Sequence, residues 1–126
     1  MPKKKRLTHD EKIIKALEKI RTPIFDQLRN LSIYFKERSR SNETGIEHVA
    51  KAYHNLDPSD IELLEDTIKN PCEHTKDKRY TRTYCYYNNR KHDKNHYIKV
   101  VVKVEKRDNK IGYISSIFIT SKIKKQ

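Results

Sequence analysis

Two histidines, His48 and His54, stand six positions apart in a segment with a helical pattern of apolar residues. Imidazole titrates near neutral pH, so each is a candidate general acid or base. Six residues of helix turn through about 600°, which leaves the two side chains roughly 240° apart. They therefore share a site only if the chain changes direction at the end of the helix and brings His54 to the same side as His48. The spacing also differs from the i, i+4 spacing of a helical metal site. His48 borders the apolar stripe and is the better candidate, and the alternative is that both histidines are solvated.

Two adjacent hydroxyls, Ser115 and Ser116, interrupt the apolar run "YISSIFIT". A buried hydroxyl needs a hydrogen-bond partner. We expect one of the two to point toward the core or toward a site on the sheet face. There it would donate to a phosphate or to a developing oxyanion, unless it only bonds to a neighbouring strand or to water.

The segment "RYTRTYCYYNN" mixes arginine with tyrosine, which suits RNA because guanidinium binds phosphate and the rings stack on bases. Arg79 and Arg82 are the candidate cations. Strand alternation separates two sets of side chains, with Tyr84 in one and Tyr87 in the other. One face is then aromatic with a cation in it, although the rings would equally serve as half-buried core.

Metal and cofactor chemistry find little support. The two cysteines are too far apart for a zinc knuckle, and the histidine pair near them falls in an expected loop; the residues concerned are Cys72, Cys85, His92 and His96. With two glycines in the chain, a glycine-rich phosphate loop is almost excluded. We expect no metal and no cofactor.

Helical patterns fill the first half of the chain. A capping box at Thr8 to Glu11 predicts a helix over 9–21. Residues 24–38 are either a short helix followed by an edge strand or one continuous helix. A third helix carries the histidines, and a fourth runs from its cap at Asp57 to Asn70-Pro71.

The second half changes to Tyr-, Val- and Ile-rich segments with polar separators. Alternation from Ile98 to Val104 is typical of a half-buried strand, and residues 107–110 form a natural hairpin turn. The prediction is an α+β domain with N-terminal helices followed by an antiparallel meander of three to four strands. Its parts are a basic disordered arm (1–7), a helical segment (8–43) and an α+β core (44–126).

The chain is strongly basic. It has 126 residues, 29 Lys and Arg against 17 Asp and Glu, and a net charge of +12. Such a charge favours a polyanionic partner, usually nucleic acid. No signal peptide or membrane span is evident, so we expect a cytoplasmic protein with two reduced thiols and no membrane partner.

The order of these motifs resembles the small phage-associated nucleases of the barnase–EndoU–colicin–RelE superfamily. The resemblance covers roughly residues 44–124. It rests on the histidine-bearing helix, the "IKNP" stop, a tyrosine-bearing strand, "YIKVVV", and a last strand with small hydroxyl residues before a basic tail.

The resemblance implies metal-independent RNA cleavage, in which the 2′-hydroxyl attacks the adjacent phosphate. His48, with His54 as the second histidine, would be the acid or base, and Ser115 or Ser116 the last-strand hydroxyl, where threonine is more usual. Tyr87 would stack or handle a proton. Lys99, and Lys122 in the basic tail, would contact phosphate.

Three functions follow as hypotheses. The first is an endoribonuclease of this type, a toxin or phage effector with an inhibitor protein as a further partner. The second is a non-catalytic RNA- or DNA-binding module with a basic, tyrosine-rich sheet. The third is a protein-interaction or inhibitor domain that buries the tyrosine-rich face against a protein partner.

Overall fold

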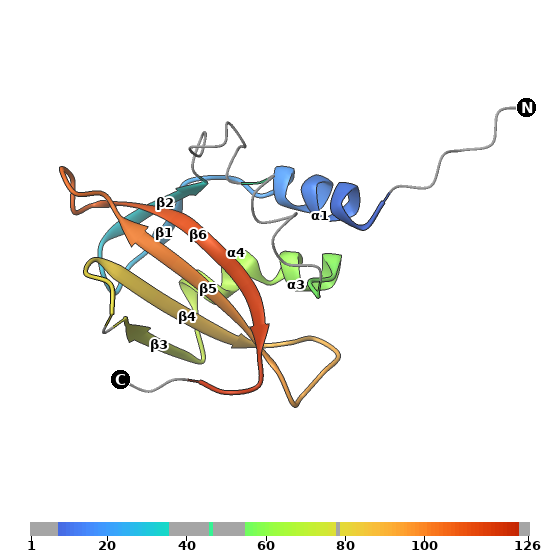
Figure 1. Cartoon of the computed structure of the whole chain (residues 1–126). Helices are drawn as coiled ribbons and strands as arrows, with labels where there is room; N and C mark the ends of the chain where they lie inside the picture. The colour runs from blue at the N-terminus through green and yellow to red at the C-terminus, as the bar shows by residue number, and fades with distance from the viewer. Residues whose placement is uncertain (1–7, 36–45, 47–54, 78, 124–126) are drawn as a thin grey trace, which may run out of the picture.

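The computed structural model describes residues 8–35, 46, 55–77 and 79–123 (Figure 1). Three helices and six strands have their bounds within this part of the chain. The helices are α1 (His9–Glu18), α3 (Pro58–Glu62) and α4 (Leu64–Lys69). The strands are β1 (Ile24–Asp26), β2 (Leu31–Phe35), β3 (Glu73–Lys76), β4 (Thr83–Asn89), β5 (Tyr97–Val104) and β6 (Ile111–Thr120). The α+β class is therefore confirmed.

The strands form one mixed sheet in the order β1-β2-β6-β5-β4-β3. The expectation of a purely antiparallel meander of three to four strands was wrong. Strands β3 to β6 are consecutive antiparallel neighbours, but β2 pairs in parallel with β6, and β1 extends the sheet beyond β2. The parallel pair joins segments about 80 positions apart in sequence, and local patterning carries no signal for such a pairing.

The N-terminal segment is only partly helical. Helix α1 begins as the capping box predicts, with Thr8 Oγ1 accepting from the Glu11 N–H at 3.2 Å. It buries Ile13 and Leu17 and ends at Glu18, earlier than expected. The short helix expected at 24–30, and the alternative of one helix over 24–38, are both wrong, because 24–26 and 31–35 are strands. In β2, Leu31 and Ile33 are buried two positions apart, which is strand periodicity.

The helix predicted from Asp57 is confirmed but divided. Asp57 forms a capping box with Asp60, and Pro58 takes the first helical position. The chain then breaks at Leu63, so that α3 and α4 are two short helices in place of one. The expected inward residues are all buried: Ile61, Leu64 and Ile68. Helix α4 packs against β1, β4 and β5.

One face of the sheet forms the hydrophobic core. Residues Ile98, Val100 and Val102 of β5 are fully buried there, beside Ile114 and Ile117 of β6. The alternate residues of β5 point to the opposite face and are more accessible. We call that opposite side the open face, because the helices α1, α3 and α4 lie on the core side (Figure 1).

Polar side chains join strands that are not neighbours in the sheet. The Tyr86 hydroxyl on β4 donates to Asp26 Oδ2 on β1 at 2.5 Å, and both residues are buried. Arg29, in the β1–β2 turn, lies with its guanidinium 4.3 Å from the centre of the Tyr84 ring and donates to His74 Nδ1 at 2.9 Å. The sheet must curl to bring β1 to β4, and Figure 1 shows this curvature.

No helix in the described part of the chain is long and apolar enough to cross a membrane. Cys72 and Cys85 are both free cysteines.

Candidate nucleic-acid interface

Two cross-strand rows of side chains run over the open face. In the first row, Lys99 of β5 pairs with Tyr87 of β4 and with Phe118 of β6. The second row has Lys103 between Thr83 of β4 and Tyr113 of β6. Directly paired residues of antiparallel strands share a face. Each lysine therefore has an aromatic neighbour, and the two rows lie about 13 Å apart along β5.

Smaller side chains separate the rows and leave a hollow. Val101 pairs with Ser116 and with Cys85 at this point. The cavity has a volume of about 360 Å³. Lys99 and Lys103 line it on β5, and the loop between β3 and β4 supplies Asp77, Arg79 and Tyr80.

A β-bulge brings both serines to this cavity. Val101 pairs with Ser116, whereas Val102 pairs with Ile114, so Ser115 is an extra residue in β6. Strict alternation would have sent the two serines to opposite faces. The bulge lets Ser115 and Ser116 line the same hollow. Two hydroxyls therefore lie between two lysines.

Few carboxylates neutralise the positive charge of the cavity among the described residues. No ion pair within the described ranges involves Arg79, Lys99 or Lys103. The one carboxylate among the lining residues is that of Asp77, which accepts the Arg79 N–H at 2.7 Å and the Tyr80 N–H at 3.2 Å. Asp77 thus organises the loop, and the cavity remains an attractive place for an anion.

Aromatic rings support Lys99. Its Nζ lies 5.1 Å from the ring centre of Phe118 and 5.5 Å from that of Tyr87. Both distances are within the range of a cation–π contact. Tyr87 is almost fully buried, so its ring fixes the lysine and does not present a face for stacking.

Cys85 lies on β4 between the two rows and is buried. Burial raises the pKa of its thiol, and the neighbouring Lys99 ammonium offsets this only in part. A thiol of raised pKa is a poor nucleophile at neutral pH. The cavity therefore offers cations, hydroxyls and aromatic rings as its working groups.

The sequence-predicted residues separate into two sets. The structure brings Arg79, Lys99, Ser115 and Ser116 together around the cavity, with Tyr87 beside Lys99. Three other residues lie elsewhere. Tyr84 is on the core side under Arg29, Arg82 Nη1 donates to the Glu105 carbonyl at 3.2 Å, and Lys122 follows the end of β6. His48 and His54 lie outside the described residues.

Four lining residues with a charged or aromatic side chain did not figure in the sequence-based site: Asp77, Tyr80, Lys103 and Phe118. A signal existed for two of them. Lys103 follows Lys99 by four positions in an alternating strand, and Phe118 follows Ser116 by two, so each shares a face with a predicted residue. Asp77 and Tyr80 belong to a loop, whose path strand alternation does not predict.

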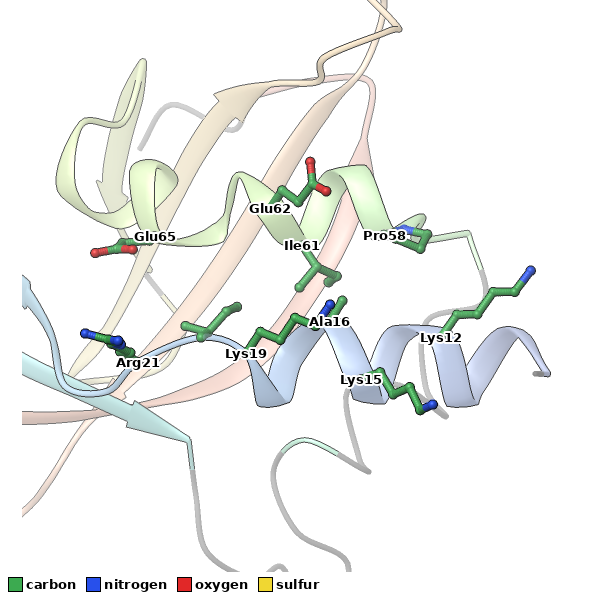
Figure 2. A pocket seen from close by; sticks show the side chains of 10 residues that line it. Lys12, Lys15, Ala16, Lys19, Arg21, Pro58, Ile61, Glu62 and Glu65 are labelled. Carbon is green, nitrogen blue, oxygen red and sulfur yellow. The ribbon is translucent and has the colours of Figure 1, made fainter. Parts of the chain in front are cut away.

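A second hollow separates α1 from α3 and α4 (Figure 2). Its volume is about 630 Å³. Lys12, Lys15 and Lys19 line the α1 side, and Glu62 and Glu65 line the other side. Glu62 and Glu65 contact lysines outside the groove, Lys91 at 4.0 Å and Lys69 at 2.7 Å, but they place negative charge along one side of it, so this groove suits a polyanion less well than the open face does.

Comparisons with protein-family models, with curated proteins and with solved structures found no match to the chain. The chemistry of the open face is therefore the basis for a function.

Proposed function

We propose that the protein binds RNA on the open face of its sheet and cleaves it without a metal ion. One observation carries the binding step: two serine hydroxyls lie between two lysines that have no carboxylate partner in the described part of the chain. Lysine ammonium groups and hydroxyl donors are common ligands of phosphate oxygens. The net charge of +12 attracts a polyanion to this surface.

The proposed reaction is transesterification. The 2′-oxygen attacks the adjacent phosphorus while a general base takes its proton, and the bond from phosphorus to the 5′-oxygen breaks as an acid protonates that oxygen. The products are a 2′,3′-cyclic phosphate and a 5′-hydroxyl. Lys99 and Lys103 would stabilise the charge that develops on the phosphoryl oxygens, and Ser115 or Ser116 would donate to one of them.

The acid–base role belongs to His48 in this proposal, with His54 as its second histidine. Both assignments rest on the resemblance to the phage-associated nucleases. Tyr87 would act by positioning the Lys99 ammonium, which lies against its ring. A toxin of this kind would have an inhibitor protein as a partner.

The second candidate is an RNA- or DNA-binding module without catalysis. It is favoured by the chemistry of the described cavity residues, which include cations, hydroxyls and aromatic rings but no histidine. Such a surface binds a phosphate backbone and has no need of proton transfer. The two candidates differ in a single outcome, which is scission of the strand.

The two candidate functions are distinguished by incubating labelled RNA in EDTA with the wild type or with His48→Ala. If the protein is an endoribonuclease, the wild type should cleave the RNA and leave cyclic phosphate ends. The His48→Ala variant should cleave about 10²–10⁴-fold more slowly. Circular dichroism checks that the variant is folded. Equal cleavage by both proteins would remove the role of His48, and intact RNA with both would leave the binding module.

A matched pair of variants tests the surface. Lys99→Ala with Lys103→Ala removes two charges from the open face. Lys106→Ala with Lys110→Ala removes two exposed charges near the β5–β6 turn, outside the cavity. We expect the first pair to weaken RNA binding strongly and the second pair only slightly. Equal effects would show that the overall charge, and not this cavity, determines binding, and no RNA binding by the wild type would favour the protein-interaction hypothesis.

A further inference from the structure

We propose that Tyr34 and Tyr113 form a stacking platform for unpaired bases, next to the phosphate-binding cavity. This inference rests on the proposed RNA binding and extends it to residues outside the cavity. The parallel pairing of β2 with β6 sets Tyr34 directly beside Tyr113 on the open face. Their ring centres are 6.4 Å apart with an interplanar angle of 43°.

Lys103 connects this platform to the cavity. It pairs with Tyr113 across β5 and β6, and it also lines the cavity. A phosphate held by Lys103 therefore has the serine hydroxyls on one side and an aromatic pair on the other. In a nucleotide strand, each phosphate is followed by a sugar that carries a base. A phosphate ligand beside an aromatic surface therefore matches the repeat of the strand.

Both tyrosine rings are partly buried in the surface of the sheet. A ring seated in this way offers an apolar surface and gives up little conformational freedom when a base stacks on it. Neither hydroxyl makes a hydrogen bond within the described part of the chain. Among the described residues, the two rings therefore take no part in a polar network.

The platform selects for single strands. In a duplex, the faces of the bases are stacked on one another and only the backbone and the groove edges are accessible. Lysines bind the phosphates of either form, so they discriminate weakly between them. Aromatic stacking is available only to an unpaired base, and it tolerates every base because each has a π-face. The preference for single strands should therefore depend on Tyr34 and Tyr113.

The experiment measures affinity of the full chain for three probes: a labelled single-stranded RNA, the same RNA annealed to its complement, and inorganic polyphosphate. His48→Ala serves as the background, so that cleavage does not distort the titration. On it are placed Tyr34→Ala with Tyr113→Ala, and Tyr34→Phe with Tyr113→Phe. The phenylalanine pair keeps both rings and removes only the hydroxyls, which makes it a matched control for stacking.

We expect the background protein to bind the single strand more tightly than the duplex. The alanine pair should lose roughly tenfold or more in affinity for the single strand, since one stacked base contributes about 1–3 kcal/mol. Its affinity for duplex and polyphosphate should hardly change. The phenylalanine pair should behave as the background does, and thermal unfolding checks that each variant is folded.

Two outcomes would overturn the inference and are distinguishable. If single strand and duplex bind equally, and the alanine pair weakens neither although the Lys99 and Lys103 substitutions weaken both, the platform is refuted while RNA binding stands. If RNA binds no better than polyphosphate and is insensitive to those lysines, the proposed function fails together with the platform.

Discussion

At the scale of single residues, the hydrogen bond between Tyr86 and Asp26 joins two strands that are far apart in the sheet order. Both partners are buried, so Tyr86→Phe leaves Asp26 Oδ2 without a hydrogen bond and with only the Arg29 Nη1 contact at 3.6 Å, while Oδ1 still accepts from the Leu28 N–H. We expect Tyr86→Phe to lower the free energy of unfolding by roughly 1–3 kcal/mol. Urea denaturation measures this change. Tyr80→Phe is the control, because Tyr80 is 60% exposed and should change stability little; a similar loss in both variants would contradict the prediction.

The Tyr86 hydroxyl should also make the free energy of unfolding depend on pH in the alkaline range. Burial raises the pKa of Tyr86, and the hydrogen bond to Asp26 raises it further. An unfolded tyrosine ionises near pH 10. The stabilisation from protonated Tyr86 is thus fully present below about pH 10 and is lost as the pH rises toward the higher pKa of the folded state.

We therefore expect the free energy of unfolding of the wild type to fall more steeply above about pH 10 than that of Tyr86→Phe. The difference in stability between the two proteins should narrow with rising pH. Urea unfolding at a series of alkaline pH values tests this, and the other titrating groups are common to both proteins. A constant difference across that range would show that Tyr86 does not contribute to the alkaline loss.

At the scale of elements, Arg90 fastens the β4–β5 loop to the start of α3. Its Nε and Nη2 donate to the two Asp60 oxygens at 2.9 and 2.8 Å, and its Nη1 donates to Asp93 at 3.2 Å. The Asp60 side chain is only 2% exposed. Because Asp60 also caps α3, a single guanidinium supports both the helix start and the loop.

Arg90→Ala should lower the free energy of unfolding by about 3 kcal/mol. This is the lower end of the range for removing one partner of a buried ion pair, since the Asp57 N–H still donates to Asp60. The stability of Arg90→Lys should lie between that of the wild type and that of Arg90→Ala, because lysine keeps the charge but cannot make the two parallel hydrogen bonds of the guanidinium. Lys91→Ala is the neighbouring control, as its 4.0 Å contact with Glu62 is exposed and should contribute at most about 1 kcal/mol.

Elements with strong local signals were predicted from the sequence. The capping residues of α1 and α3, the inward residues of α4, and the strand alternation of β5 all agree with the structure. Strand β3 was missed because its four residues, Glu73 to Lys76, are all polar. Their burial alternates only between half-buried and exposed, so no apolar periodicity marks the strand in the sequence. Strand β1 has three residues, too few for a periodicity to be visible.

The candidate site was predicted in part for the same reason. Strand alternation separated Lys99 from the buried Ile98 and separated Tyr87 from Tyr84, and both separations hold because alternation is a local property of strands. The bulge that turns both serines to that side was not predictable, since it depends on how β6 pairs with β5. The contacts of Arg29 with Tyr84 and His74 arise from the curl of the whole sheet and have no counterpart in local sequence.

At the scale of the whole molecule, the net charge of +12 and the charge of one face make different predictions for RNA binding. Long-range attraction by the total charge is screened within about 8–10 Å at physiological salt. Lysines in contact with phosphate act instead by releasing counterions, so affinity falls linearly on a plot of log K against log salt concentration. The slope of that plot counts contacts and separates the two contributions.

We expect Lys99→Ala with Lys103→Ala to reduce the magnitude of this slope for single-stranded RNA by about 1.4. Each phosphate contact to a single strand contributes about 0.7, and two contacts are removed. Lys106→Ala with Lys110→Ala lowers the net charge by the same two units but should leave the slope nearly unchanged. Fluorescence anisotropy over a range of salt concentrations, on the His48→Ala background, gives both slopes. Equal reductions in the two pairs would mean that RNA is held by diffuse charge, and the lysines of the open face would lose their assignment as phosphate contacts.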